Sequence, residues 1–159
     1  EIGCGTGKNL KPLAQAYPDA EVVGLDLSTD MLNVAQKTLA PFGDRVRFIQ
    51  QRYDQPLHLQ GEPLYDLILC SYSLTMINPG WDTVIESAVQ DLEVGGQLAM
   101  TDFHDSRFNW YKRWMGTNHV RMDSHLLPKL QSLLKTEVAE VKSAYGFVWE
   151  YVVFIGTRE

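Results

Sequence analysis

Strand-length apolar runs alternate with helix-length segments along most of this chain, and this alternation constrains its fold more than any other feature. The longer segments repeat their apolar residues at helical spacing, whereas the shorter ones are bounded by turn residues. Such an order is typical of βαβ units around a parallel sheet. The expected strands are 21–26, 45–50, 66–71 and 97–103, and the expected helices are 7–17, 28–40 and 81–92.

The apolar pattern also predicts which positions are buried. Ser28 is the expected N-cap of its helix. The buried faces of the first two helices are expected to be Leu10, Leu13, Ala14 and Tyr17, and Met31, Leu32, Ala35 and Leu39. Segment 66–71 is nearly all apolar, which predicts a central parallel strand covered on both faces. A Gly95-Gly96 turn is expected before the strand at 97–103.

The last third of the chain follows a different pattern. A helix is expected at 124–134, and strand-like runs at about 137–144 and 149–157 flank Gly146. A glycine between two such runs predicts an antiparallel hairpin. The predicted fold class is therefore α/β, a doubly wound, mostly parallel seven-stranded sheet with an antiparallel C-terminal hairpin.

The length and composition limit the class of protein. The 159 residues suffice for one domain with its own core, and 45% hydrophobic residues exclude a disordered chain. No run approaches the roughly 18 apolar residues of a membrane-spanning helix. Because Glu1 to Gly3 read as a strand end, the single domain, 1–159, is expected to lack its N-terminal helix and most of strand 1. Cys4 and Cys70 are too few for a disulfide framework, which indicates a reducing compartment, the cytoplasm.

Three alternating glycines, Gly3, Gly5 and Gly7, stand between a strand and a helix. Glycine lets the backbone turn sharply and approach a ligand closely. The dinucleotide-binding pattern needs its third glycine at position 8, which is lysine. A phosphate-binding P-loop needs glycine at position 2 and Ser or Thr at position 9, which are Ile2 and Asn9. Both of these nucleotide loops are therefore disfavoured.

The acidic-first pattern of residues 1–7 resembles the first motif of class I S-adenosylmethionine-dependent methyltransferases, which have a Rossmann-like fold. The resemblance implies that Glu1 and the three glycines bind S-adenosylmethionine. An acidic residue suits the ammonium and sulfonium charges of that cofactor, and glycine backbone suits its amino-acid tail. A purely structural turn is the alternative.

Asp26 ends the next expected strand, 23 residues after Gly3. This offset is close to the one at which an acidic residue binds ribose hydroxyls in such folds. Residues 24–28 followed by Met31 resemble the family's second motif, which implies that Leu27 and Met31 pack against adenine. Simple helix core is the alternative for Met31. Asp54 matches a position near the adenine amino group, and a solvated loop aspartate is the alternative there.

Residues 65–71 resemble the family's fourth motif, and the match runs in order from Glu1 to about Phe103. Ligands lie beyond the carboxyl ends of parallel strands, which predicts Ser71 and Tyr72 beside the transferred methyl group. Tyr72 is the candidate that positions the acceptor nitrogen, and His104 is the candidate base. An ordinary core tyrosine and an exposed loop histidine are the alternatives. His58, His119 and His125 share no ligand spacing, so no metal is expected.

Residues 71–77 with Trp81, and 102–103, Trp110, Trp114 and 122–130, resemble the N-methyltransferases of betaine lipids. Where that group has Pro-Asp-His, this chain has Asp-Ser-His at 123–125. The resemblance implies N-methylation of a diacylglyceryl-homoserine headgroup. Open alternatives are a methyltransferase for a soluble small molecule, a phospholipid or a quinone, aminocarboxypropyl transfer, and a non-catalytic cofactor-binding module.

Segment 106–122 combines basic and aromatic residues and contains no acidic one, so it carries a charge of +4 while the remainder carries −10. Such a segment suits peripheral contact with a membrane surface. A helix whose aromatic rings complete the core is the alternative. The net charge of −6 disfavours nucleic acid as a partner, which leaves a small molecule or a lipid as substrate.

Overall fold

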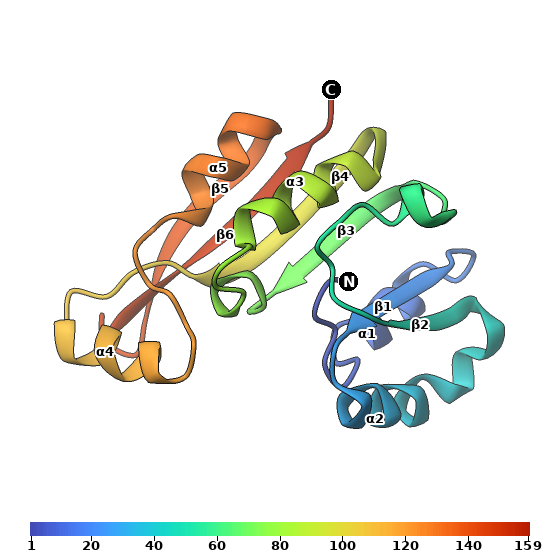
Figure 1. The fold of residues 1–159 in the computed structure, drawn as a ribbon, viewed down its shortest axis with the longest axis horizontal. Helices are drawn as coiled ribbons and strands as arrows, with labels where there is room; N and C mark the ends of the chain where they lie inside the picture. The colour runs from blue at the N-terminus through green and yellow to red at the C-terminus, as the bar shows by residue number, and fades with distance from the viewer. The chain divides into compact units, whose positions relative to one another are not determined.

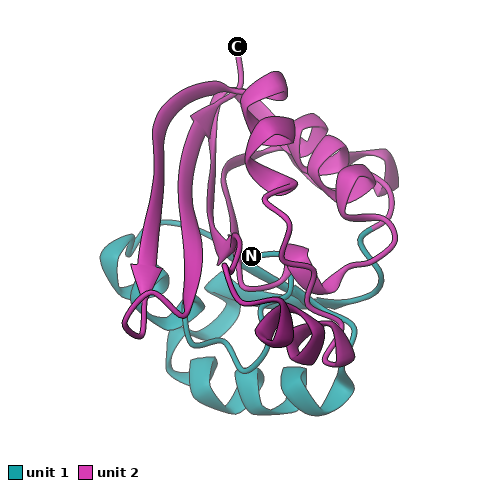
Figure 2. Ribbon diagram, turned by 90° about the vertical axis from the view of Figure 1, so that its left-hand side faces the viewer, with its two compact units in different colours: residues 1–53 teal, residues 54–159 magenta.

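The computed structural model describes residues 1–159, which divide into two compact units, Glu1–Tyr53 and Asp54–Glu159 (Figure 2). Both units contain a pair of parallel strands joined through helical segments. The chain contains six strands, where the sequence predicted a seven-stranded sheet. No helix is long and apolar enough to span a bilayer.

The first unit is one βαβ element with a loop and a helix before it (Figure 1). Strands β1 and β2 pair in parallel from Val22 and Val46 to Asp26 and Gln50. Ile2 forms an isolated parallel bridge with Leu25. Its elements are α1 (Leu10–Ala16), β1 (Val22–Asp26), α2 (Thr29–Leu39), the 3-10 helix η1 (Ala40–Arg45) and β2 (Val46–Gln50).

Helix α2 begins as predicted, because the Ser28 hydroxyl accepts a hydrogen bond from the Met31 amide at 3.3 Å. Leu32 and Leu39 are buried on its inner face. Met31 is 45% exposed and Tyr17 is 57% exposed, so the prediction that both face the core is wrong. Tyr17 is the C-cap residue of α1, beyond the last helical turn, so helical spacing no longer fixes the direction of its side chain.

Gly24 in the centre of β1 is required by close packing. A Cβ atom at this position would lie 2.7 Å from Leu10 Cδ1, 2.9 Å from Cys4 Sγ and 2.9 Å from Phe48 Cδ1. Leu10 and Cys4 belong to the buried core of this unit, and Phe48 packs against that core. Interiors packed at crystal-like density do not absorb an added methyl group without displacement.

The second unit contains a four-stranded sheet in the order β3-β4-β6-β5. β3 and β4 are parallel, whereas β6 runs antiparallel to both β4 and β5, as the predicted hairpin requires. In Figure 1, α3 and α5 lie side by side over the sheet. The elements are η2 (His58–Gln60), β3 (Tyr65–Ser71), η3 (Leu74–Met76), α3 (Trp81–Asp91), β4 (Leu92–Phe103), α4 (Asn109–Thr117), α5 (Leu126–Leu133), β5 (Lys135–Ala144) and β6 (Trp149–Thr157).

Two details of β3 and β4 differ from the prediction. Ile68 and Cys70 of β3 are buried, but Leu67 is 38% exposed, so this strand is not covered along its whole length. β4 begins at Leu92, directly after α3. Leu92 pairs with Tyr65, but Leu67, two residues further along β3, already pairs with Gln97, so the register shifts between these two pairs. The predicted glycine turn is therefore an irregularity inside β4, after which regular parallel pairing resumes.

Replacing Gly24 with alanine is expected to lower the free energy of unfolding by about 1–3 kcal/mol, because the added methyl group overpacks the core. Gly116 in α4 is the matched control, since a Cβ there meets nothing within 4 Å. Gly116→Ala is expected to be neutral or stabilising by up to about 1 kcal/mol. Urea unfolding of the two variants measures both values, and equal stability of the two would contradict this account of the core.

Candidate functional site

The glycine loop of the first unit has the conformation that its sequence predicts. Gly3, Gly5 and Gly7 all have positive φ, at 71°, 51° and 78°. The Gly3 and Cys4 amides donate to the Leu25 carbonyl at 2.8 and 3.0 Å, which ties the loop to β1. Burial raises the pKa of the Cys4 thiol to about 12, so this cysteine stays protonated and is not a nucleophile.

The carboxylate of Asp26 holds the loop to the start of α2. Its Oδ2 accepts a hydrogen bond from the Gly5 amide at 2.8 Å, and its Oδ1 accepts one from the Ser28 amide at 2.9 Å. A carboxylate offers about four lone-pair positions, so both oxygens can still accept from a vicinal diol. The arrangement is chemically suited to the ribose role that the sequence predicts for Asp26.

Glu1 is oriented by a residue that the sequence analysis did not assign to the site. The Asn9 side-chain amide donates to Glu1 Oε1 at 2.7 Å. Burial raises the pKa of the Glu1 carboxyl, although the Asn9 hydrogen bond opposes that shift. In the sequence, Asn9 served only to exclude a P-loop. Its side-chain amide, eight residues after the acidic Glu1, was the signal that could have predicted this hydrogen bond.

Two apolar side chains of the first unit remain at its surface. Leu27 is 63% exposed and Met31 is 45% exposed, which excludes the core alternative for Met31. Both lie close in sequence to Asp26, at the start of α2. An exposed apolar pair beside a carboxylate can pack on the flat face of a base whose sugar binds that carboxylate.

The other predicted residues lie in the second unit. Asp54 is exposed, and Ser71 is the last residue of β3. Tyr72 follows with a φ of 50°, and its amide donates to the Thr101 carbonyl at 2.9 Å. Burial raises the pKa of the Tyr72 phenol, which therefore stays neutral near pH 7. Its side chain is 38% exposed, so Tyr72 is not an ordinary core tyrosine.

Tyr72 belongs to a group of five aromatic side chains, here called the ring cluster. Its ring centroid lies 5.0 Å from that of Phe103 and 6.4 Å from that of Trp149. The members are Tyr72, Phe103, Tyr145, Trp149 and Tyr151. The sequence analysis identified only Tyr72, since the others come from the end of β4 and from the hairpin.

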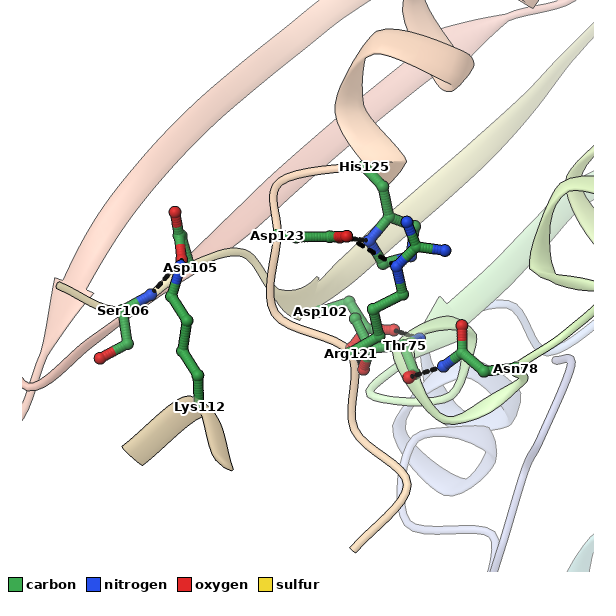
Figure 3. Close-up of polar contacts among 9 residues, drawn as sticks. All are labelled: Thr75, Asn78, Asp102, Asp105, Ser106, Lys112, Arg121, Asp123 and His125. Carbon is green, nitrogen blue, oxygen red and sulfur yellow. Dashed lines mark hydrogen bonds and ion pairs between the residues drawn. The ribbon is translucent and has the colours of Figure 1, made fainter. Parts of the chain in front are cut away.

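Asp102 fixes the segment that follows Tyr72 (Figure 3). This fully buried carboxylate accepts hydrogen bonds from the amides of Leu74 and Thr75, at 2.8 and 3.2 Å, and from the Thr75 hydroxyl. Burial raises its pKa, although the hydrogen bonds from Thr75 and the neighbouring amides oppose that shift. Thr75 in turn accepts from the Asn78 side chain at 2.6 Å through its carbonyl. The turn after β3 is therefore held from both sides.

The two histidines near this turn have different surroundings. The His104 amide donates to the Glu150 carbonyl at 2.8 Å, and its Nδ1 is buried without a hydrogen-bond partner, unlike an exposed loop histidine. His125 Nδ1 is bonded to the Asp123 carboxylate (Figure 3), whereas its Nε2 is buried without a partner.

His125 resembles a general base more closely than His104 does. Its side chain is only 8% exposed, and burial lowers its pKa below 6.5, so the ring is neutral at pH 7. A neutral imidazole that donates from Nδ1 to a carboxylate presents an acceptor at Nε2. The Trp81 ring packs edge-on against it, with centroids 4.5 Å apart. The Asp-x-His spacing at 123–125 was the signal for this pair, but the sequence predicted neither residue as a base.

A glycine loop tied to the next strand by an acidic residue is typical of the nucleoside-binding half of a Rossmann-like domain. Residues 1–96 match a family model described as "Methyltransferase domain". That match covers more than half of the chain, and the chain therefore belongs to this methyltransferase family. Its cofactor is S-adenosylmethionine.

Curated relatives with similar sequences include two kinds of O-methyltransferase. The malonyl-[acyl-carrier protein] O-methyltransferase of Priestia megaterium is 32% identical over 108 residues, which cover 68% of this chain and 37% of the relative. The ubiquinone biosynthesis O-methyltransferase of Pectobacterium carotovorum is 26% identical over 76% of this chain and 48% of the relative. The chain thus spans less than half the length of these two proteins.

Solved structures with the same fold include two N-methyltransferases. NodS from Bradyrhizobium japonicum, in complex with S-adenosyl-L-homocysteine, has a TM-score of 0.78 at 18% identity. The superposition covers 99% of this chain and 75% of the NodS chain. A phosphoethanolamine N-methyltransferase of Haemonchus contortus has a TM-score of 0.79 at 15% identity, over 99% of this chain and 47% of its own. At these identities the two structures establish the fold alone.

Replacing Asp26 with alanine is expected to weaken S-adenosylmethionine binding by about tenfold to a hundredfold, because charge-assisted hydrogen bonds contribute about 1.5–3 kcal/mol each. Asp19→Ala, at an exposed turn of the same unit, is the control and should bind like the wild type. Calorimetric titration with S-adenosylmethionine and S-adenosylhomocysteine measures both. Equal affinities for wild type and Asp26→Ala would remove the ribose assignment.

Proposed function

We propose that this protein transfers the methyl group of S-adenosylmethionine to the amine nitrogen of a lipid headgroup of the diacylglyceryl-homoserine type. One observation carries the lipid part of the proposal. The helix with exposed tryptophans, α4, packs through buried Met115 into a small core that also contains Phe103 and Trp149 of the ring cluster. Helix α4, the proposed membrane contact, and the candidate acceptor site thus share one set of packed side chains.

The cofactor half of the reaction rests on the glycine loop and Asp26. The loop amides and the Asp26 carboxylate suit the amino-acid tail and the ribose, and the exposed Leu27 and Met31 suit the adenine. The carboxylate of Glu1 supplies negative charge for the cofactor's ammonium. Asp54 and Ser71 of the second unit are proposed as further cofactor-binding residues, as the resemblance to the family's motifs implies.

Methyl transfer is an in-line displacement in which the protein mainly orients and desolvates the reactants. The nitrogen lone pair forms a bond to the methyl carbon, and the electron pair of the breaking C–S bond stays on sulfur. The acceptor amine must first lose a proton to a base. We assign the positioning of the nitrogen to Tyr72. The acceptance of that proton is assigned to the Asp123–His125 pair, with His104, the base that the sequence predicts, as the second candidate.

Helix α4 has one face for the core and one for a bilayer. Met115 is buried and Tyr111 is half-buried, whereas Trp110 and Trp114 are 64% and 57% exposed. These two tryptophans stand one helical turn apart and share a face. Their amphipathic rings suit the headgroup region of a membrane. The alternative, a partly buried helix whose aromatic rings complete the core, therefore fits Tyr111 but not Trp110 or Trp114.

Two of the four positive charges in segment 106–122 are paired with aspartate carboxylates. Lys112 is paired with Asp105, and Arg121 is paired with Asp123 at 2.7 Å. Arg107 and Arg113 are the exposed cations that remain for anionic lipid, with Arg107 stacked over the Phe108 ring at 4.8 Å. Two cations with two tryptophans predict weak, reversible binding rather than stable anchoring.

Replacing both Trp110 and Trp114 with serine is expected to weaken binding to vesicles of phosphatidylglycerol and phosphatidylcholine by about tenfold, because the apolar area that enters the interface is lost. The matched control is Leu59→Ser with Val94→Ser, since these residues are 68% and 77% exposed elsewhere in the same unit. Vesicle sedimentation measures both double variants. If both double variants lose vesicle binding equally, exposed apolar area in general, rather than the tryptophans of α4, would determine binding.

A direct test of the proposed function is product analysis. The protein is incubated with S-adenosylmethionine and diacylglyceryl-homoserine in vesicles, and the lipid is expected to gain one to three methyl groups on nitrogen. Asp26→Ala should lower this yield through loss of cofactor affinity. A gain of the four-carbon aminocarboxypropyl group, or no product although cofactor binds, would contradict the proposal.

O-Methylation is a second candidate, favoured by the Asp123–His125 pair. A hydroxyl acceptor needs a base during transfer, and the neutral His125 ring presents Nε2 as an acceptor. The relatives from Priestia and Pectobacterium are named as O-methyltransferases. Competition between the lipid amine and a hydroxylated quinone precursor as acceptors separates the two candidates.

A further inference from the structure

The ring cluster lies at one end of the four-stranded sheet and is assembled from three strands. Tyr72 follows β3, Phe103 ends β4, and Trp149 and Tyr151 belong to β6. Phe103 pairs with Tyr151 in the antiparallel register of β4 and β6, and Trp149 points to the same side as Tyr151 because side chains alternate along a strand. Tyr145 adds a fifth ring from the β5–β6 turn, with its centroid 6.2 Å from that of Trp149.

The backbone at the cluster departs from ordinary conformations. Tyr72 and Tyr145 have φ values of 50° and 47°, although neither is glycine. Non-glycine residues in the left-handed region cost free energy and persist where surrounding structure enforces them. The Tyr72 amide is fixed by the Thr101 carbonyl at 2.9 Å, so this strain is maintained by β4. In this conformation the Tyr72 ring lies beside the rings of Phe103 and Trp149.

The rings of the cluster meet at different angles, and Tyr145 stacks on Trp149 with 28° between the ring planes. The Tyr72 ring plane is inclined by 73° to that of Trp149 and by 63° to that of Phe103. Tyr72 is 38% exposed and Tyr145 is 82% exposed, so the cluster is open to solvent. A small cation on the solvent-exposed faces of these rings can approach their centroids within about 6 Å, the range of cation–π attraction.

The cation–π contacts of Arg45 with Phe42, Arg107 with Phe108 and Arg121 with Trp81 all lie outside the ring cluster. Lys142 pairs with Tyr151 in the register of β5 and β6, and its positive charge is balanced by an ion pair with Glu140 at 2.7 Å. Burial is the main cause of the raised pKa of Tyr72, and the negative charge of Asp102 adds to that shift. The Asp102 charge therefore favours a positively charged ligand at Tyr72.

We propose that the ring cluster is a binding site for a methylated ammonium group, with quaternary trimethylammonium as its best ligand. A primary ammonium needs hydrogen-bond acceptors, whereas a quaternary one has no donor, is weakly hydrated and binds through ring faces. This inference rests on the proposed N-methylation, because the site would retain the headgroup as methyl groups accumulate. The shared chemistry is the trimethylammonium group, whether it belongs to a lipid or to a free molecule.

Choline and its neutral isostere 3,3-dimethylbutan-1-ol are the probes, since they differ by one charge at the same shape. Ligand-observed NMR titration should give saturable choline binding that is about five- to tenfold tighter than that of the isostere. Trp149→Leu should weaken choline binding by about the same factor, while Trp149→Phe, which keeps a ring, should retain part of it. Tyr72→Leu is expected to weaken binding as well.

Tyr17→Leu is the matched control for Tyr72→Leu, because Tyr17 is 57% exposed in the other unit. Circular dichroism and thermal unfolding establish that each variant is folded. Equal affinity for choline and its isostere, or unchanged affinity in folded Trp149→Leu, would overturn the proposal. If Trp149→Leu loses choline binding and Trp149→Phe regains none of it, the proposal would also be overturned. The shape of the tryptophan side chain, rather than an aromatic ring face, would then be responsible for binding.

The source of the trimethylammonium group is distinguished by a second arm. Vesicles with a trimethylammonium lipid headgroup should compete with free choline for the wild-type protein if the lipid reaches the cluster, and competition should disappear in Trp149→Leu. Choline binding without such competition assigns the site to a soluble ligand. Methyl transfer is assayed separately, so choline binding in the absence of transfer supports the ring cluster while the proposed N-methylation fails.

Discussion

The pair of hydrogen bonds accepted by Asp26 is the interaction on which the candidate cofactor site depends. One oxygen holds the Gly5 amide of the loop, and the other holds the Ser28 amide that precedes α2. The loop and the helix start therefore have a common anchor at the end of β1. Because charge-assisted hydrogen bonds are strong and directional, the site is organised before a ligand arrives, which reduces the entropy lost on binding. The carboxylate that organises the loop is thus also the predicted ligand of the ribose.

The predictable parts of the fold are those determined by local chemistry. The three glycines need positive φ, Ser28 caps its helix through its own hydroxyl, and Gly146 separates two strands of a hairpin. In each case residues within a few positions supply the whole cause. The ribose role of Asp26 remains a prediction, yet its place at the loop follows from strand order alone.

The parts that escaped prediction depend on contacts between distant segments. Periodicity placed Met31 on a buried face, but its surroundings leave it exposed. The hydrogen bond from Asn9 to Glu1 and the ring cluster around Tyr72 join side chains that no single motif contains. Similarly, Lys112 and Arg121 are paired with aspartates, so the charge of +4 counted along segment 106–122 overstates the positive charge that remains free to bind a ligand.

The buried carboxylate of Asp102 helps to fix the orientation of the exposed ring cluster. A ring face open to solvent binds a cation well only if its orientation is fixed in advance. On one side, Asp102 holds the amides of Leu74 and Thr75, which restricts the segment directly after Tyr72. On the other side, antiparallel pairing of Phe103 with Tyr151 fixes the hairpin rings. Asp102 and Phe103 are adjacent at the end of β4, so one strand end positions both sides of the ring cluster. A change at Asp102 would therefore act on ligand binding through ring orientation rather than through its own charge.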